Sequence, residues 1–130
     1  MITVAALLLT AFLFGGMLLY SFGFAAFVFK TLPAEQAGRL LREAFPHFYA
    51  WCILTSVAAA LPFYFVDPLS AGLLLAVAVT TIPIRQVLMP AINSATDSGN
   101  KSRFNVLHSA SVTLTLLHIG TVGYCLTRLL

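Results

Sequence analysis

Charged side chains are scarce in this sequence: only 8% of its 130 residues are Asp, Glu, Lys or Arg. A soluble domain of average composition carries roughly 25% charged residues, so a water-exposed surface cannot be built here. Hydrophobic residues make up 60% of the chain, and its mean hydropathy is +0.97. Most of the chain must therefore face lipid or other helices, and the sequence predicts an integral membrane protein.

Sequence signatures of chemistry are also missing. The chain has no CxxC, no HExxH, no phosphate-binding glycine loop and no serine nucleophile motif, so no catalytic constellation is found and we expect no enzyme. The two cysteines, Cys52 and Cys125, are each embedded in apolar runs and are expected to be buried, unreactive thiols. The net charge of +3 does not indicate a nucleic-acid partner, because the few basic residues lie between apolar runs.

Four apolar segments are long enough to cross a bilayer. We expect spans at about residues 2–29, 46–66, 69–90 and 104–126, which predict an all-α, four-helix membrane bundle as a single domain over residues 1–130. The first span has no basic segment before it and is too long for a signal peptide, so it is expected to stay in the membrane. Residues 33–44 form an amphipathic pattern too short to span, which predicts a short interfacial helix between the first two spans.

The positions of Lys and Arg predict the orientation. The connector between the first and second spans carries Lys30, Arg39 and Arg42, and the connector between the third and fourth carries Lys101 and Arg103. The opposite hairpin carries only an aspartate. The positive-inside rule then makes the basic connectors cytoplasmic and leaves both termini outside, in the cell (inner) membrane.

Small residues occur at matched positions in the first span. Gly16 and Gly23 are seven residues apart and share a helix face, where a neighbouring backbone could approach closely. Such a face favours association, so we expect a homo-oligomer or a larger membrane complex, with membrane lipid as the other partner.

Arg85 is the clearest charged residue inside a predicted span, and such residues are functional candidates. Two interpretations are open. The side chain could snorkel toward the cytoplasmic headgroups. Alternatively, it could face the bundle and bind an anion, a carboxylate or the backbone carbonyls exposed by Pro83 or Pro90.

Further polar residues lie near the face of Arg85 at helical spacings. They are Gln86 and Asn93, and Asp97 extends the series if the helix continues beyond Pro90. In the fourth span, His108, Ser111, Thr115 and His118 cover an arc of about 80°. This stripe should face other helices, where its side chains either form interhelical hydrogen bonds or contribute to a site.

His47 opens the second span on the same side of the membrane as His108. A pair of histidines between helices could ligate haem or copper, which makes His47, His108 and His118 weak metal candidates. We predict no cofactor, and keep this redox interpretation as the alternative.

Several of these motifs together resemble the transmembrane-protein-205-like family of small multi-pass membrane proteins, whose function is not characterised. The resemblance rests on LPAEQAGRLLREAFPHFY, on an Arg, Pro, Asn and Asp in the third span, and on FNVLHSASV. It implies a helical membrane bundle. An Asn that often follows the last-span Ser is replaced by Thr113 and Thr115. The matching positions are Leu32, Pro33, Phe45, Pro46, Phe48, Arg85, Pro90, Asn93, Asp97, Leu107, His108 and Ser111.

The sequence therefore favours a non-enzymatic membrane protein that binds or moves a small polar or anionic ligand, or that serves as a subunit of an assembly. The alternative is a haem- or metal-binding redox protein. The candidate ligand-binding residues are Arg85, Gln86, Asn93, Asp97, His108 and Ser111.

Overall fold

The computed structural model describes every residue from Met1 to Leu130, and its regular elements are all helices. Two short segments, η1 and η2, are π-helical, and each continues directly into the α-helix that follows it. The elements in chain order are α1 (Ile2–Leu18), η1 (Leu19–Phe24), α2 (Ala25–Thr31), α3 (Ala34–Val66), α4 (Pro68–Pro83), η2 (Ile84–Leu88), α5 (Met89–Asp97) and α6 (Lys101–Thr127).

These elements join into four long helical rods. They cover Ile2–Thr31, Ala34–Val66, Pro68–Asp97 and Lys101–Thr127, with 27 to 33 residues each and mean window hydropathies of 1.3 to 2.3. About 20 apolar residues suffice to cross the hydrocarbon core of a bilayer. The chain is thus a multi-pass membrane protein with four spans, and the predicted all-α bundle is confirmed.

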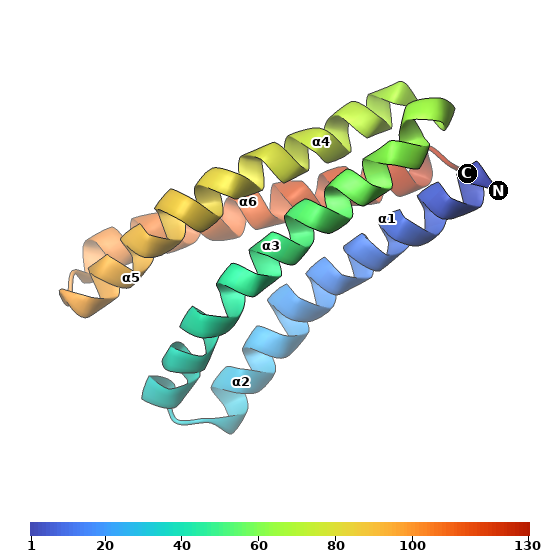
Figure 1. The fold of residues 1–130 in the computed structure, drawn as a ribbon. Helices are drawn as coiled ribbons and strands as arrows, with labels where there is room; N and C mark the ends of the chain where they lie inside the picture. The colour runs from blue at the N-terminus through green and yellow to red at the C-terminus, as the bar shows by residue number, and fades with distance from the viewer.

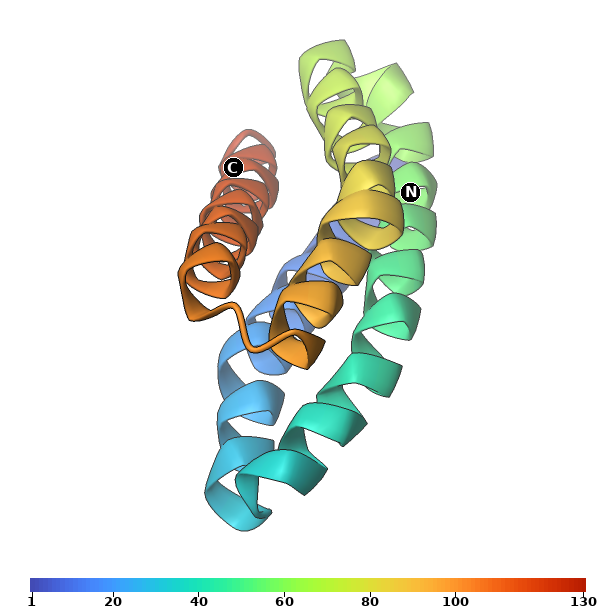
Figure 2. The same ribbon diagram turned by 90° about the vertical axis from the view of Figure 1, so that its left-hand side faces the viewer.

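The rods run antiparallel, and the two ends of the bundle differ (Figure 1). Both termini lie at the end that holds the α3–α4 turn. The other end holds the α2–α3 and α5–α6 connections, and we call it the basic end because the adjoining helix ends carry Lys30, Arg39, Arg42, Lys101 and Arg103. There α2 and the start of α3 diverge from α5 and the start of α6, as Figures 1 and 2 show. The bundle is consequently wedge-shaped.

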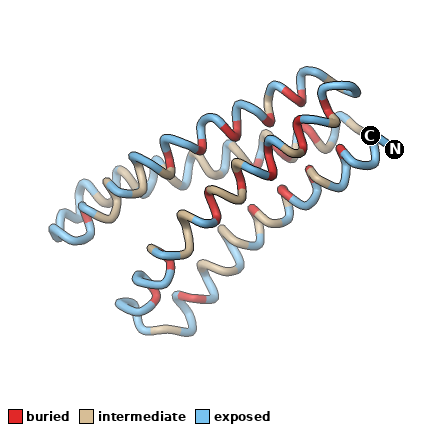
Figure 3. Tube along the Cα trace, in the orientation of Figure 1, coloured by how far each residue is buried: buried red, intermediate tan, exposed pale blue.

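Buried residues follow the facing sides of α1, α3 and α4 (Figure 3). Large apolar side chains are exposed on the outside of the bundle. The core includes Leu13, Phe63 and Leu74, none of which is exposed. Phe12, Leu54 and Phe65 are 60%, 71% and 74% exposed on the outer surface. Such a surface is suited to lipid, since in water it would be an aggregation hazard.

The prediction of a separate interfacial helix over residues 33–44 is wrong. Those residues form the first turns of α3, which continues through Pro46 and Pro62 to Val66. Proline removes one backbone hydrogen bond, a loss that packing can offset. Around Pro46 that packing is aromatic: the Phe48 ring stacks on Tyr20 with ring centroids 4.2 Å apart.

The helix of the third span does not end at Pro90, a point that the sequence left open. It continues past Pro90 to Asp97, with the π-helical η2 between Pro83 and Met89. Pro90 cannot donate a hydrogen bond to the carbonyl four residues earlier, and a π-helical turn accommodates this gap in the α-helical pattern. Beyond α5 the chain turns at Gly99, whose φ of +68° is accessible to glycine.

Within the chain, no neighbouring backbone is among the nearest atoms at Gly16 or Gly23. Gly16 instead faces the Trp51 ring of α3, and a Cβ atom there would overlap that ring. At Gly23 the nearest side chain is Leu19 of the same helical rod. Gly16 thus makes room for an aromatic side chain within one chain.

Candidate functional site

The main feature of the basic end is a cavity of about 790 Å³. It lies inside the wedge, and its walls come from η1 and α2, from the first half of α3, from η2 and α5, and from α6. Both π-helical segments contribute to the walls, Ser21 and Phe22 from η1 and Ile84 and Leu88 from η2. π-Helical turns are frequent at functional sites because they change the direction of the side chains that follow.

The walls are mainly apolar and aromatic. Fourteen of the 25 lining residues are hydrophobic, among them Phe22, Phe45 and Phe104. Phe45 belongs to an aromatic cluster in which its ring meets that of Tyr20 edge-on, with centroids 5.3 Å apart. Aromatic packing of this kind holds the wall of α3 against the first rod.

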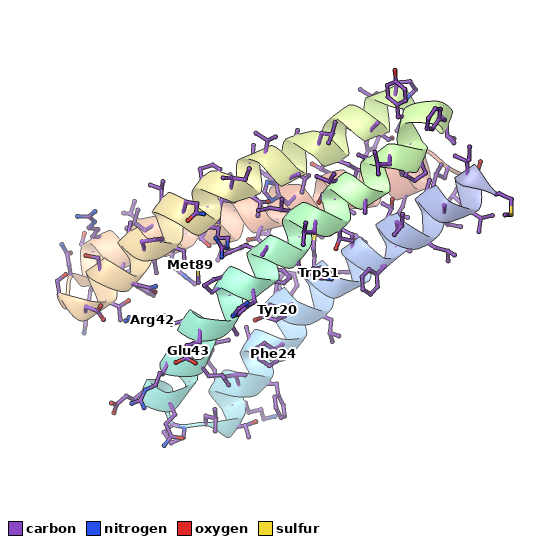
Figure 4. The ribbon with its side chains drawn as sticks, viewed as in Figure 1. Tyr20, Phe24, Arg42, Glu43, Trp51 and Met89 are labelled. Carbon is purple, nitrogen blue, oxygen red and sulfur yellow. The ribbon has the colours of Figure 1, made fainter.

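Charged side chains gather at the rim of the cavity. Arg42 of α3 binds Asp97 of α5 through two parallel hydrogen bonds: Nη2 to Oδ1 at 2.9 Å and Nη1 to Oδ2 at 3.3 Å. Glu35 and Arg39 form a looser pair, with 3.7 Å between Oε1 and Nη2. Figure 4 shows Arg42 of α3 and Met89 of α5 on the sides that face the opening. The rim therefore carries two cations and two anions.

Further polar side chains line the cavity. His108 stacks on Phe104, with ring centroids 5.3 Å apart. Asn93 and Ser111 reach the cavity from α5 and α6. The Ser21 hydroxyl oxygen is buried in the wall without a hydrogen-bond partner. A ligand could use these groups in addition to the rim.

Four of the six candidate residues from the sequence come together in this cavity, namely Asn93, Asp97, His108 and Ser111. Arg85 and Gln86 are not among its lining residues. The Arg85 Nε donates a hydrogen bond to the Pro46 carbonyl oxygen at 3.0 Å. Arg85 therefore faces the bundle, but its partner is a carbonyl of α3 and not one exposed by the prolines of its own span. Gln86 is exposed on the outer surface.

The three histidines occupy different surroundings. His118 Nε2 lies 2.8 Å from Thr80 Oγ1, so this side chain forms the predicted interhelical hydrogen bond between α6 and α4. His47 is exposed and does not line the cavity, whereas His108 does. No three His, Cys, Asp or Glu side chains form a group that could hold a metal ion.

Sequence reasoning missed Arg42 as a site residue. Arg42 lies in the amphipathic pattern of residues 33–44, and an arginine in such a pattern is ordinary. Only the continuity of α3 places Arg42 opposite Asp97. Tyr49, which is buried and lines the cavity, gave no sequence signal because it lies in an apolar run.

The opposite end of the bundle is held by a second ion pair. Arg128 donates to both carboxylate oxygens of Asp67, with 3.0 Å between Nη2 and Oδ1. The hydrogen bonds from Arg128 and Ser70 hold the pKa of the Asp67 carboxyl well below its usual range. The same pair raises the pKa of Arg128. This contact fixes the end of α6 to the α3–α4 turn.

The fold and the cavity define a multi-pass helical membrane protein with a polar-rimmed cavity at one end of the bundle. The chain belongs to the family described as Domain of unknown function (DUF4149), whose model matches residues 8–101. The match covers the first rod from residue 8 and the whole of the second and third rods, and it ends where α6 begins, so His108 and Ser111 lie outside it. No curated protein and no solved structure matches the chain.

Proposed function

We propose that this chain binds a single-chain amphiphile, with an anionic head group at the rim of the cavity and an apolar tail between the helices. One observation carries the proposal: the cavity combines mainly hydrophobic walls with a rim that contains Arg39 and Arg42. Its volume of about 790 Å³ lies within the range of roughly 300–1,000 Å³ that is typical of small-molecule sites.

The physical basis is the division of the ligand between two environments. Each methylene group of a tail contributes about 0.8 kcal/mol when it leaves water for an apolar site. In a membrane the tail gains much less, because lipid is equally apolar, and selectivity then depends on the head group. Charge-assisted hydrogen bonds from arginine to a carboxylate or phosphate supply that selectivity.

The proposal is limited to binding. The walls diverge only at the basic end, whereas the opposite end is packed and joined by the Asp67–Arg128 pair. A path across the membrane would need this end to separate. Arg85, the residue first expected to recognise the ligand, is engaged with α3 instead, and Arg42 takes its place in the proposal.

A cavity-filling substitution tests the proposal. Gly38 lines the cavity, and a Cβ atom there meets nothing within 4 Å, so Gly38→Phe should fold and occupy the ligand space. Gly72→Phe is the matched control, because Gly72 has the same free space but does not line the cavity. Trp51 is the only tryptophan, and energy transfer from it to cis-parinaric acid, a fluorescent fatty acid, measures binding in non-ionic detergent.

We expect saturable binding by the wild type and by Gly72→Phe, and at least a tenfold loss of affinity in Gly38→Phe. Excess oleate should displace the probe, which separates site binding from partition into micelles. Equal affinity in all three proteins would overturn the proposal.

We also propose that the basic end faces the cytoplasm of the cell (inner) membrane, with both termini outside. Five of the seven basic residues lie in the helix ends next to the α2–α3 and α5–α6 connections, which supports this orientation. The relation to the transmembrane-protein-205-like family stays a prediction from the motifs quoted above.

A further inference from the structure

The Arg42–Asp97 pair is a direct link between charged side chains of the two walls of the cavity. α2 packs on α3 to form one wall, and α5 packs on α6 to form the other. Arg42 lies on the first wall and Asp97 on the second, with 55 residues between them in the sequence. Both side chains line the cavity, so the pair lies where a ligand head group would have to bind.

The geometry of the pair resembles that of a bound ligand. A guanidinium group has parallel N–H donors that match the two oxygens of a carboxylate or the oxygens of a phosphate. The Asp97 carboxylate meets Arg42 in this two-bond arrangement. Glu35 and Arg39 do not adopt this two-bond arrangement, because they are joined by a single contact of 3.7 Å.

We propose that Asp97 is an internal substitute for the ligand's head group, and that a carboxylate or phosphate on an acyl chain displaces it from Arg42. The inference rests on the proposed function and adds the chemistry of the head group and the residue that competes with it. In the empty protein Asp97 neutralises Arg42. In the complex the ligand takes the guanidinium and Asp97 turns to water.

Exposure makes this exchange feasible. The Arg42 and Asp97 side chains are 38% and 64% exposed, so Asp97 can be hydrated once it is released. Exposed ion pairs contribute little to stability compared with buried ones, from which a charge cannot be released without a large penalty. An anionic head group held beside apolar walls can therefore compete with Asp97.

The proposal predicts opposite effects from the two partners of the pair. Asp97→Asn removes the competing charge and should tighten cis-parinaric acid binding about fivefold, the equivalent of an exposed ion pair. Arg42→Gln should weaken binding at least fivefold. In the double variant, Asp97→Asn should give no gain, because its effect acts through Arg42.

Glu43→Gln is the matched control. Glu43 is exposed, does not line the cavity, and follows Arg42 directly, so this variant changes the net charge by the same amount as Asp97→Asn. A gain in Glu43→Gln equal to that in Asp97→Asn would overturn the proposal, because the effect would then be general electrostatics. Thermal unfolding of each variant should show that the bundle is folded.

Competitors of one chain length distinguish the head groups. The inhibition constants of oleate and oleoyl lysophosphatidic acid, each calculated with the probe's own affinity for that protein, should be lower for Asp97→Asn than for the wild type, and their ranking separates carboxylate from phosphate. Monoolein, which is neutral, should have the same inhibition constant for both proteins, and inorganic phosphate should not compete with either.

The two proposals can fail separately. If Gly38→Phe abolishes binding but Asp97→Asn has no effect, the cavity binds the amphiphile and the role of Asp97 is wrong. If Gly38→Phe has no effect either, the proposed function itself fails.

Discussion

At the level of single residues, Gly16 shows how closely the first and second rods are fitted. A Cβ atom at Gly16 would overlap the Trp51 ring, whereas one at Gly15 meets nothing within 4 Å. We expect Gly16→Ala to lower stability by about 1–3 kcal/mol, the usual range for overpacking. Gly15→Ala should be neutral or slightly stabilising, because alanine favours helix more than glycine.

Thermal unfolding in detergent, followed by circular dichroism, measures this difference. Trp51→Phe in the Gly16→Ala background should recover part of the loss, because the smaller ring leaves space for the methyl group. If Gly15→Ala and Gly16→Ala had the same unfolding midpoint, the contact would not be significant.

The sequence identified a good part of the candidate site at this scale. Polar residues in apolar spans are conspicuous, and Asn93, Asp97, His108 and Ser111 do line the cavity. Arg85 was equally conspicuous, but a sequence does not show which partner a side chain will find. The structure gives it the Pro46 carbonyl, a backbone group that no sequence pattern marks.

At the level of elements, the structure differs from the prediction at two prolines. Pro46 suggested a boundary between an interfacial helix and a span, and Pro90 left the end of the third span open. Both lie within continuous helical rods. Tertiary packing decides whether a helix continues through proline, and near Pro46 the aromatic partner of α3 is Tyr20 of the first rod.

The Asp67–Arg128 pair, which attaches the end of α6 to the α3–α4 turn, makes the stability of the protein depend on pH. The pKa of Asp67 is lowered in the folded protein, mainly by the hydrogen bond from Arg128, and is about 3.9 in an unfolded chain. A carboxyl with a lowered folded pKa stabilises the protein above its unfolded pKa. This contribution is lost as the pH falls through the folded pKa.

We therefore expect Asp67→Asn to unfold at a lower temperature than the wild type at pH 7. The difference between the two unfolding midpoints should narrow as the pH falls below about 4, because the Asp67 carboxyl of the unfolded wild type then binds a proton while the folded one does not. Unfolding midpoints from pH 7 to pH 2 measure this, with Glu43→Gln as a control for general charge effects. A gap that is independent of pH would contradict a role for the Asp67 charge.

At the level of the whole molecule, the number of spans followed from composition and length alone, because each rod must be long and apolar enough to cross the bilayer. The wedge shape of the bundle could not be predicted from composition and length. It depends on how far α2 and the start of α3 diverge from α5 and α6, which side-chain packing decides. Hydropathy reports which residues avoid water, and does not separate those that face lipid from those that face another helix.

Orientation in the membrane determines which compartment the cavity faces. The buried Cys52 and Cys125 should react slowly, so single cysteines can be added at exposed positions near each end. Ser102 lies at the basic end, and Leu130 lies at the end that holds both termini. With a membrane-impermeant maleimide on intact spheroplasts, Leu130→Cys should be labelled and Ser102→Cys should be labelled only after lysis. The reverse pattern would place the cavity mouth outside the cell, and the search for an amphiphile would then turn to the outer leaflet.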